Sequence, residues 1–77
     1  MEITTTQEKI LMTLRDIGDS ATSKIAGYNS LDYHYCLFLL KFLSENKFII
    51  KTVMGKSTYW GITKKGLLKL NGSNNGK

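Results

Sequence analysis

The feature that most constrains the fold of this chain is its longest apolar-periodic stretch, residues 31–50, which reads LDYHYCLFLLKFLSENKFII. One set of its apolar residues repeats at the i, i+3, i+4, i+7 spacing of a single helical face. These residues are Cys36, Leu39, Leu40 and Leu43. Asp32 stands just ahead of them, where its carboxylate can cap the first turn. The stretch therefore predicts a long helix that buries one face in a core.

The opposite side of the same helix is also rich in apolar residues. It carries Tyr33, His34, Leu37, Phe38 and Phe42, with Lys41 as the cation among them. Large exposed apolar surfaces usually mark binding sites, so a helix side of this composition requires a partner.

Two shorter helices are expected before this one. Thr5 and Glu8 have the spacing of a capping box, and an apolar stripe follows them up to Gly18, which predicts a first helix at about residues 6–17. The stripe consists of Ile10, Leu11, Leu14 and Ile17. Residues 22–28 predict a short second helix before the break at Asn29 and Ser30. Its inward residues are Ile25 and Ala26.

A β-hairpin is expected after the long helix. Residues 48–53 and 58–62 are rich in β-branched and aromatic side chains, and Met54-Gly55-Lys56-Ser57 between them has the composition of a turn. Strand alternation places Trp60 and Ile62 on the core side, with Tyr59 facing out. Lys56 then lies at the tip of the hairpin.

The chain closes with a short helix and a tail. Thr63 can cap a helix that runs from Lys64 to about Leu70. The last residues, NGSNNGK, have the composition of a flexible segment. We therefore expect one domain at residues 1–70 and a flexible C-terminal tail at residues 71–77.

A short helix, a tight break and a longer helix beginning at Asp32 have the spacing of a helix-turn-helix. With the first helix, the hairpin and the last helix, the predicted fold class is α+β, a winged helix-turn-helix. It has a three-helix core, a two-stranded β-hairpin wing and a short C-terminal helix. In this fold the long helix is the one that enters the major groove of DNA.

The charges are distributed unevenly along the chain. Residues 1–45 hold six acids and four bases, whereas residues 46–77 hold seven lysines and no acid. Such a one-signed half is typical of proteins that bind a polyanion, most often nucleic acid and less often an anionic membrane surface. A lysine-rich surface kept for solubility is the alternative.

No apolar run approaches the roughly 20 residues of a membrane span, and the beginning of the chain has no signal-peptide pattern, so we expect a cytoplasmic protein.

The sequence resembles a known family at three places: the run KIAGYNSLDYHYCLFLLKFLSENKFIIK, the hairpin after it, and the ending YWGITKKGLLKL. These are similar to archaeal winged-helix DNA-binding proteins, which include small chromatin-associated proteins and regulators of viruses and plasmids. The similarity covers about residues 7–70, and its most specific part is ITKKGLLKL, where these families place the last wing strand, a threonine cap and a helix start. The resemblance implies binding of double-stranded DNA, homodimerisation and no catalysis.

The resemblance also implies candidate DNA-binding residues. The recognition helix would begin at Asp32, and the wing would span residues 51–58. The DNA-facing positions of the helix are Tyr33, His34, Leu37, Phe38 and Lys41. Two departures from the family stand out. Relatives commonly carry polar or basic residues where this chain has Leu37 and Phe38, and many continue into a long dimerising helix where this chain ends in NGSNNGK.

The expected contacts divide between positioning and reading. Lysines neutralise phosphates and make binding salt-dependent, but they do not read sequence. The lysines suited to this are Lys47, Lys51, Lys56, Lys64 and Lys65. Tyr33 and His34 can hydrogen-bond to phosphates or base edges, and Leu37 or Phe38 can touch a thymine methyl group. The alternative is packing of the aromatic and apolar side chains against the first helix, the wing or a second subunit. These side chains are Tyr33, Tyr35, Leu37, Phe38 and Phe42.

The sequence offers little for catalysis or metal binding. His34 has no cysteine or carboxylate at ligand spacing, and Cys36 is a single cysteine on an apolar face. Asp16 and Asp19 flank the first turn and are typical of turn residues rather than of a paired acid and base. We expect a protein that is not an enzyme, with no catalytic residue, cofactor, metal or small-molecule substrate.

The predicted function is that of a double-stranded DNA-binding protein and transcriptional regulator, sequence-specific or semi-specific. Two alternatives stay open at this point. One is a winged-helix module that binds another protein through the apolar side of the long helix. The other is an architectural protein that binds DNA without regard to sequence.

Overall fold

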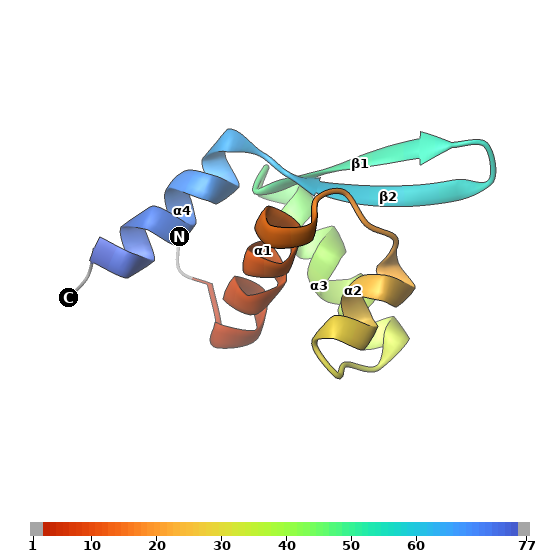
Figure 1. The fold of residues 1–77 in the computed structure, drawn as a ribbon, viewed down its shortest axis with the longest axis horizontal. Coiled ribbons are helices and arrows are strands. Elements are labelled where there is room, and N and C mark those ends of the chain that lie inside the picture. Colours follow the sequence, from red (N-terminus) through yellow and green to blue (C-terminus); the bar gives the residue numbers. More distant parts are fainter. Residues whose placement is uncertain (1–2, 76–77) are drawn as a thin grey trace.

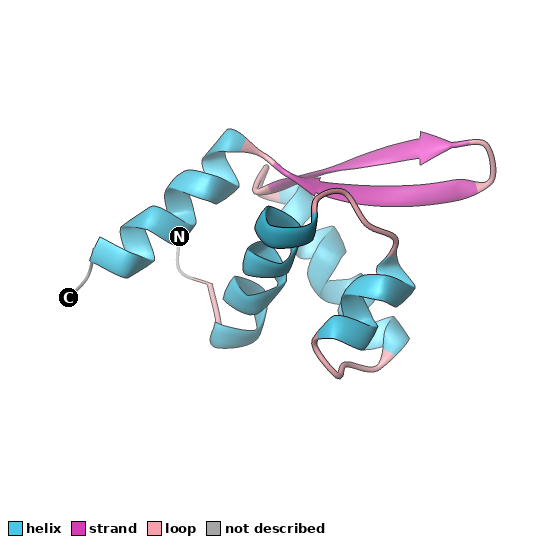
Figure 2. Cartoon of the chain, in the orientation of Figure 1, coloured by secondary structure: helices cyan, strands magenta, loops and turns pink. Residues whose placement is uncertain are grey.

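The computed structural model describes residues 3–75 and the side chains of residues 3–71. Its elements are, in order, α1 (Thr5–Ile17), α2 (Thr22–Tyr28), α3 (Tyr33–Glu45), β1 (Ile49–Met54), β2 (Ser57–Ile62) and α4 (Lys64–Asn75). Helices α1, α2 and α3 form one cluster, the hairpin extends from it to one side, and α4 extends to the other (Figures 1 and 2). This arrangement confirms the predicted winged helix-turn-helix.

The N-cap of helix α1 lies one residue before the predicted cap, Thr5. The N-cap is Thr4, whose Oγ1 accepts from the Gln7 amide at 3.2 Å, while the Gln7 side chain accepts from the Thr4 amide at 2.8 Å. The predicted box of Thr5 and Glu8 is therefore wrong by one register. Gln7 is buried and Glu8 is not. Burying a neutral amide costs less free energy than burying a carboxylate, which favours the register with Gln7 inside.

The hydrophobic core lies where the apolar periodicities predicted it. It combines residues of α1, α2 and α3 with the base of the hairpin and α4, and its largest fully buried side chains include Ile10, Leu11, Leu14, Ile25, Leu40, Leu43 and Ile49. Asp32 caps α3 as expected, since its Oδ2 accepts from the amides of His34 at 3.0 Å and Tyr35 at 3.2 Å. The core side of α3 is thus confirmed.

The hairpin is tied to the helices at its base. β1 and β2 pair antiparallel, with Lys51 opposite Trp60 and Met54 opposite Ser57, so that Gly55 and Lys56 form the turn. The backbone of Trp60 exchanges two hydrogen bonds with Ser20, of 2.9 and 3.0 Å. Its indole Nε1 also donates to Thr22 Oγ1 at 2.9 Å. These bonds hold the second strand against the start of α2, while the outer part of the hairpin projects into solvent.

Helix α4 is capped by Thr63, as predicted, because the Gly66 amide donates to Thr63 Oγ1 at 3.1 Å. The helix ends at Asn75 rather than near Leu70, and Leu70 is buried against the core. The composition of NGSNNGK predicts an end near Leu70, but residues of low helix propensity set a helix boundary poorly. The division into a domain and a flexible tail stays a prediction, and residues 76–77 of that tail lie outside the described residues. Among residues 3–75, no helix is both long and apolar enough to cross a bilayer.

Candidate nucleic-acid interface

A groove of about 450 Å³ runs between α3 and the hairpin. It is lined by Thr22, Tyr33, Leu37, Lys41, Ser44, Glu45, Lys51, Thr58 and Trp60. The lining includes two cations, Lys41 from the helix and Lys51 from β1, and one anion, Glu45. The groove thus brings together four of the predicted site residues, namely Tyr33, Leu37, Lys41 and Lys51.

The register of the hairpin explains how Lys51 reaches this groove. Directly opposed residues of antiparallel strands point to the same side, so Lys51 shares a side with its partner Trp60. That side faces the helices, because Trp60 is buried against them and bonded to Thr22. Lys51 therefore lies on the wall of the groove, and its side chain is exposed.

The outward side of α3 presents aromatic side chains at high exposure. Phe38 is 66% exposed and Tyr33 is 48% exposed. His34 is exposed as well and meets the Tyr33 ring edge to face, with a centroid separation of 5.5 Å. The side chains placed on this helix side by prediction are not all equivalent, however. Leu37 and Phe42 are partly buried and pack against the core.

The predicted lysines separate into two groups in space. Lys51 and Lys56 lie on the wing, with Lys56 in the turn at its tip. Lys47, Lys64 and Lys65 lie where α3 ends and α4 begins, at the other end of β2 (Figure 1). A six-residue strand spans roughly 20 Å. Lys56 at the tip is therefore separated by about that length from Lys47, Lys64 and Lys65, whereas Lys51, opposite Trp60, lies closer to the base of the hairpin.

Lys65 already has partners within the fold. Its Nζ donates to the Asn46 carbonyl oxygen at 2.9 Å and lies 4.9 Å from the centroid of the Phe48 ring. Beside it, Lys47 has a φ of 68°, and its carbonyl oxygen lies 2.6 Å from Thr63 Oγ1. Lys65 thus joins the end of α3 to the start of α4, a role that its position in a lysine-rich run did not indicate.

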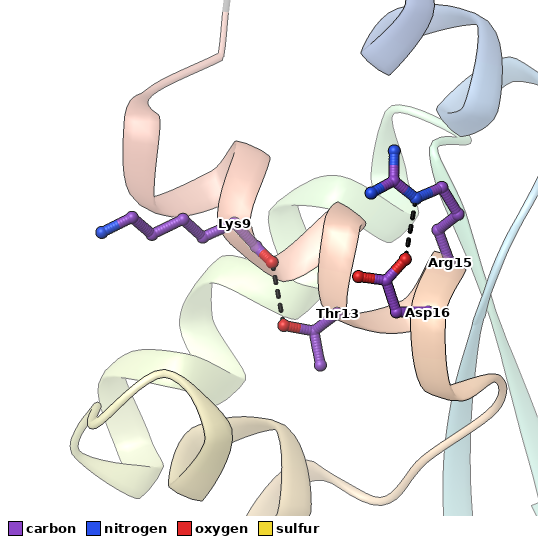
Figure 3. A network of polar contacts seen from close by, with 4 residues as sticks. All are labelled: Lys9, Thr13, Arg15 and Asp16. Carbon is purple, nitrogen blue, oxygen red and sulfur yellow. Dashed lines mark hydrogen bonds and ion pairs between the residues drawn. The ribbon is translucent and has the colours of Figure 1, made fainter.

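Asp16 and Cys36, the other titratable residues considered for chemistry, are engaged within the fold. Asp16 pairs with Arg15 on the exposed surface of α1 at 3.0 Å, close to the hydrogen bond of 2.9 Å that Thr13 donates to the Lys9 carbonyl (Figure 3). Burial raises the pKa of the Cys36 thiol to about 11, so the thiol stays protonated at neutral pH. Within residues 3–75, no group of three or more potential metal ligands occurs.

Sequence reasoning missed several residues of this region. Trp60 is buried in the core, as strand alternation predicts, but it also lines the groove together with Thr22 and Thr58. The signal for Trp60 and Thr58 is the register of the hairpin, since Lys51–Trp60 and Val53–Thr58 are pairs on one side of it. Thr22 lies in α2, and no local pattern indicated it. Tyr28, at the end of α2, is a further exposed aromatic residue, at 61%.

No protein-family model matches the sequence, and no curated protein matches it. The structure is nevertheless similar to many solved structures. A MarR family protein from Bacillus stearothermophilus superposes with a TM-score of 0.86 at 17% identity, over 94% of this chain and 51% of that one. A "probable transcriptional regulator" from Pseudomonas aeruginosa gives 0.88 at 17% identity, over 94% and 57%.

Lactococcus lactis ZitR, solved as a C30S mutant, gives a TM-score of 0.85 at 26% identity, over 97% of this chain and 53% of that one. The chain therefore spans about half the length of these neighbours. The similarity extends over all the elements from α1 to α4, and it establishes the winged-helix fold.

Proposed function

We propose that this chain binds double-stranded DNA as a transcriptional regulator and that it is not an enzyme. The observation that carries the proposal is the groove in which Lys41 of α3 and Lys51 of the wing come together beside the exposed side of the helix. A recognition helix and a wing contact neighbouring parts of one duplex, and lysines on both can neutralise its phosphates. The structural neighbour described as a probable transcriptional regulator supports the same conclusion.

The proposed contacts follow the two sides of the groove. Tyr33, His34, Leu37, Phe38 and Lys41 are proposed to face the major groove from α3, with Leu37 contributing the least because it is partly buried. Lys51 and Lys56 hold backbone phosphates from the wing. Lys47, Lys64 and Lys65 reach DNA only if the duplex extends past the end of α3, so their contacts are the most distal of the proposal.

The chain is proposed to act as a cytoplasmic, DNA-associated homodimer, as its winged-helix resemblance implies. A dimer places two recognition helices on successive major grooves, which increases affinity and requires paired half-sites. An archaeal, viral or plasmid origin belongs to the same proposal. One neighbour, Bordetella bronchiseptica BpsR, is described as regulated in its DNA binding by 6-hydroxynicotinic acid. By analogy, a small-molecule effector of DNA binding is part of the proposal for this chain.

The test is the binding of labelled duplex DNA, followed by fluorescence anisotropy between about 50 and 200 mM salt. Three lysines from each of two subunits, Lys41, Lys51 and Lys56, would neutralise six phosphates and give a slope of log K against log salt of about −5. A monomer would give about −3. Binding that does not respond to salt, or no binding at low salt, contradicts the proposal.

A variant of the wing separates residues that position the protein on the DNA backbone from residues that read its bases. Lys56→Ala removes a cation at the tip of the wing, and we expect it to weaken binding to all duplexes about equally, because phosphates carry no sequence. A loss confined to one sequence would instead show that the wing reads bases. Equal affinity for random and selected duplexes would assign the chain to architectural binding.

The second candidate is a module that binds another protein. The exposed aromatic surface favours it, since Tyr28 is 61% and Phe38 is 66% exposed on neighbouring helices. Phe38→Glu discriminates between the two. Loss of DNA binding by a protein whose oligomeric state is unchanged supports recognition of DNA, whereas conversion of a dimer to a monomer assigns the surface to self-association.

A further inference from the structure

Phe38 is the most exposed large apolar side chain of α3, and it lies near the middle of the helix. The residues His34, Phe38, Lys41 and Glu45 follow one another at i, i+4, i+7 and i+11, which places them on one stripe of the helix. This stripe lies opposite the buried face that contains Leu40. Phe38 is therefore flanked along the stripe by an imidazole on one side and an ammonium group on the other.

Leu37 is excluded from the same role by its surroundings. It is partly buried, packs against the core and lines the groove next to Tyr33. Its side chain is thus committed to the wall between α3 and the hairpin. Sequence reasoning left Leu37 and Phe38 as equal candidates, and the burial of the two side chains separates them.

The chemistry of the major groove narrows what a phenyl ring on this stripe can recognise. Base edges there present hydrogen-bond donors and acceptors, which an apolar ring cannot satisfy, and one apolar group, the C5-methyl of thymine. We propose that Phe38 is a specificity-determining residue that contacts a thymine methyl in the major groove. The inference rests on the proposed DNA-binding function and names the base feature that the helix reads.

The first experiment removes that methyl without altering the protein. Bound duplexes are selected from random DNA and resynthesised with deoxyuridine at one thymine position at a time, which preserves base pairing. Loss of one contacted methyl should weaken binding about fourfold, which corresponds to about 0.8 kcal/mol. We expect this loss at one position, or at two related by symmetry if the chain is a dimer, and none elsewhere.

The second experiment assigns the contact to the residue. In Phe38→Ala, thymine and uracil duplexes should bind equally, because the side chain that distinguishes them is absent. Met54→Ala is the matched control, since Met54 is apolar and 63% exposed but lies on the wing, and it should retain the fourfold difference. Both side chains are exposed, so both variants should melt within a few degrees of the wild type.

The outcomes separate the inference from the proposed function. Wild-type protein that binds selected thymine and uracil duplexes equally overturns the role of Phe38 and leaves DNA binding in place. A thymine preference that persists in Phe38→Ala assigns the methyl contact to another residue and also overturns it. Absence of any duplex binding at low salt overturns the proposed function itself. A Phe38→Ala protein that changes from dimer to monomer assigns the ring to self-association.

Discussion

Two regions of the molecule carry lysines of the same sequence run, and they use them differently. In the wing region, which comprises the hairpin and its groove with α3, Lys51 extends from a strand whose residues after Ile49 are all exposed. In the corner region, where α3 ends and α4 begins, Lys65 bonds to Asn46 and lies against Phe48. Local charge density therefore does not predict what a lysine contacts within the fold, because the surrounding packing decides it.

The largest expected difference between the regions concerns two glycines. Gly66 of the corner is buried, and a Cβ there would meet the Phe48 carbonyl oxygen and Ile62 Cγ1 well inside contact distance. We expect Gly66→Ala to lower the free energy of unfolding by about 3 kcal/mol, because backbone on one side cannot yield. Urea unfolding measures this.

The control for Gly66→Ala is Gly55→Ala at the tip of the wing. Gly55 has a φ of 64° but open space around it. An added Cβ meets no neighbour there, so we expect the free energy of unfolding to fall only by the cost of a left-handed backbone conformation, about 1 kcal/mol. Equal losses in the two variants would show that the corner is not the tighter of the two regions.

The base of the wing provides the next effect. Thr22→Val removes the acceptor of the Trp60 indole, and the N–H is buried, so we expect a loss of about 2 kcal/mol in unfolding free energy. Thr52→Val, at an exposed position of β1, serves as control and should change stability by less than about 0.5 kcal/mol. A Thr22 variant as stable as its control would mean that the indole hydrogen bond does not anchor the wing.

A pair of lysine variants tests the comparison directly. Lys65→Ala should cost about 1 kcal/mol of stability, because it loses a hydrogen bond and a ring contact in the corner. Lys51→Ala should leave stability almost unchanged and weaken DNA binding several-fold at low salt. Thermal melting and anisotropy on the same samples measure both. If Lys65→Ala changes the free energy of DNA binding more than the free energy of unfolding, the division of the two regions is wrong.

The smallest effect on stability at neutral pH is expected from ionisation of Cys36, in the core that the two regions share. Because its pKa is raised to about 11, the thiol ionises in the unfolded chain at lower pH than in the folded one. Ionisation of this thiol leaves the free energy of unfolding unchanged below about pH 8.5 and lowers it as the pH rises toward 11. Cys36→Ala should remove this alkaline decline.

Thiol labelling of the native protein at neutral pH extends the same test. It should be slow and should require unfolding, because the thiol is protonated and buried. Rapid labelling of the folded protein would mean that the core opens independently of the wing and the corner.

Local patterns in the sequence were sufficient for much of this structure. The periodicity of Cys36, Leu39, Leu40 and Leu43 predicted the buried side of α3, and Asp32 predicted its start. The alternation around Trp60 predicted the hairpin, and Thr63 predicted the start of α4. These features depend on residues within a few positions of one another, so the side-chain chemistry of a short segment determines them. The contact of the candidate residues with DNA stays a prediction.

Other features depended on how distant segments pack. The cap of α1 is one of them: Thr5 and Glu8 have the spacing of a capping box, but the structure uses Thr4 with Gln7, which is buried. The same packing turned Leu37 inward and left Phe38 exposed, although the two are adjacent in sequence.

The lysines give the clearest case of this dependence. Lys51 and Lys65 belong to one basic run, yet strand register directs Lys51 into the groove with α3, and the meeting of α3 with α4 engages Lys65 elsewhere. The sequence by itself determined the sign of the charge and the helices and strands that carry it. The direction in which each charge points came from contacts between residues far apart in the chain, which no short sequence pattern contains.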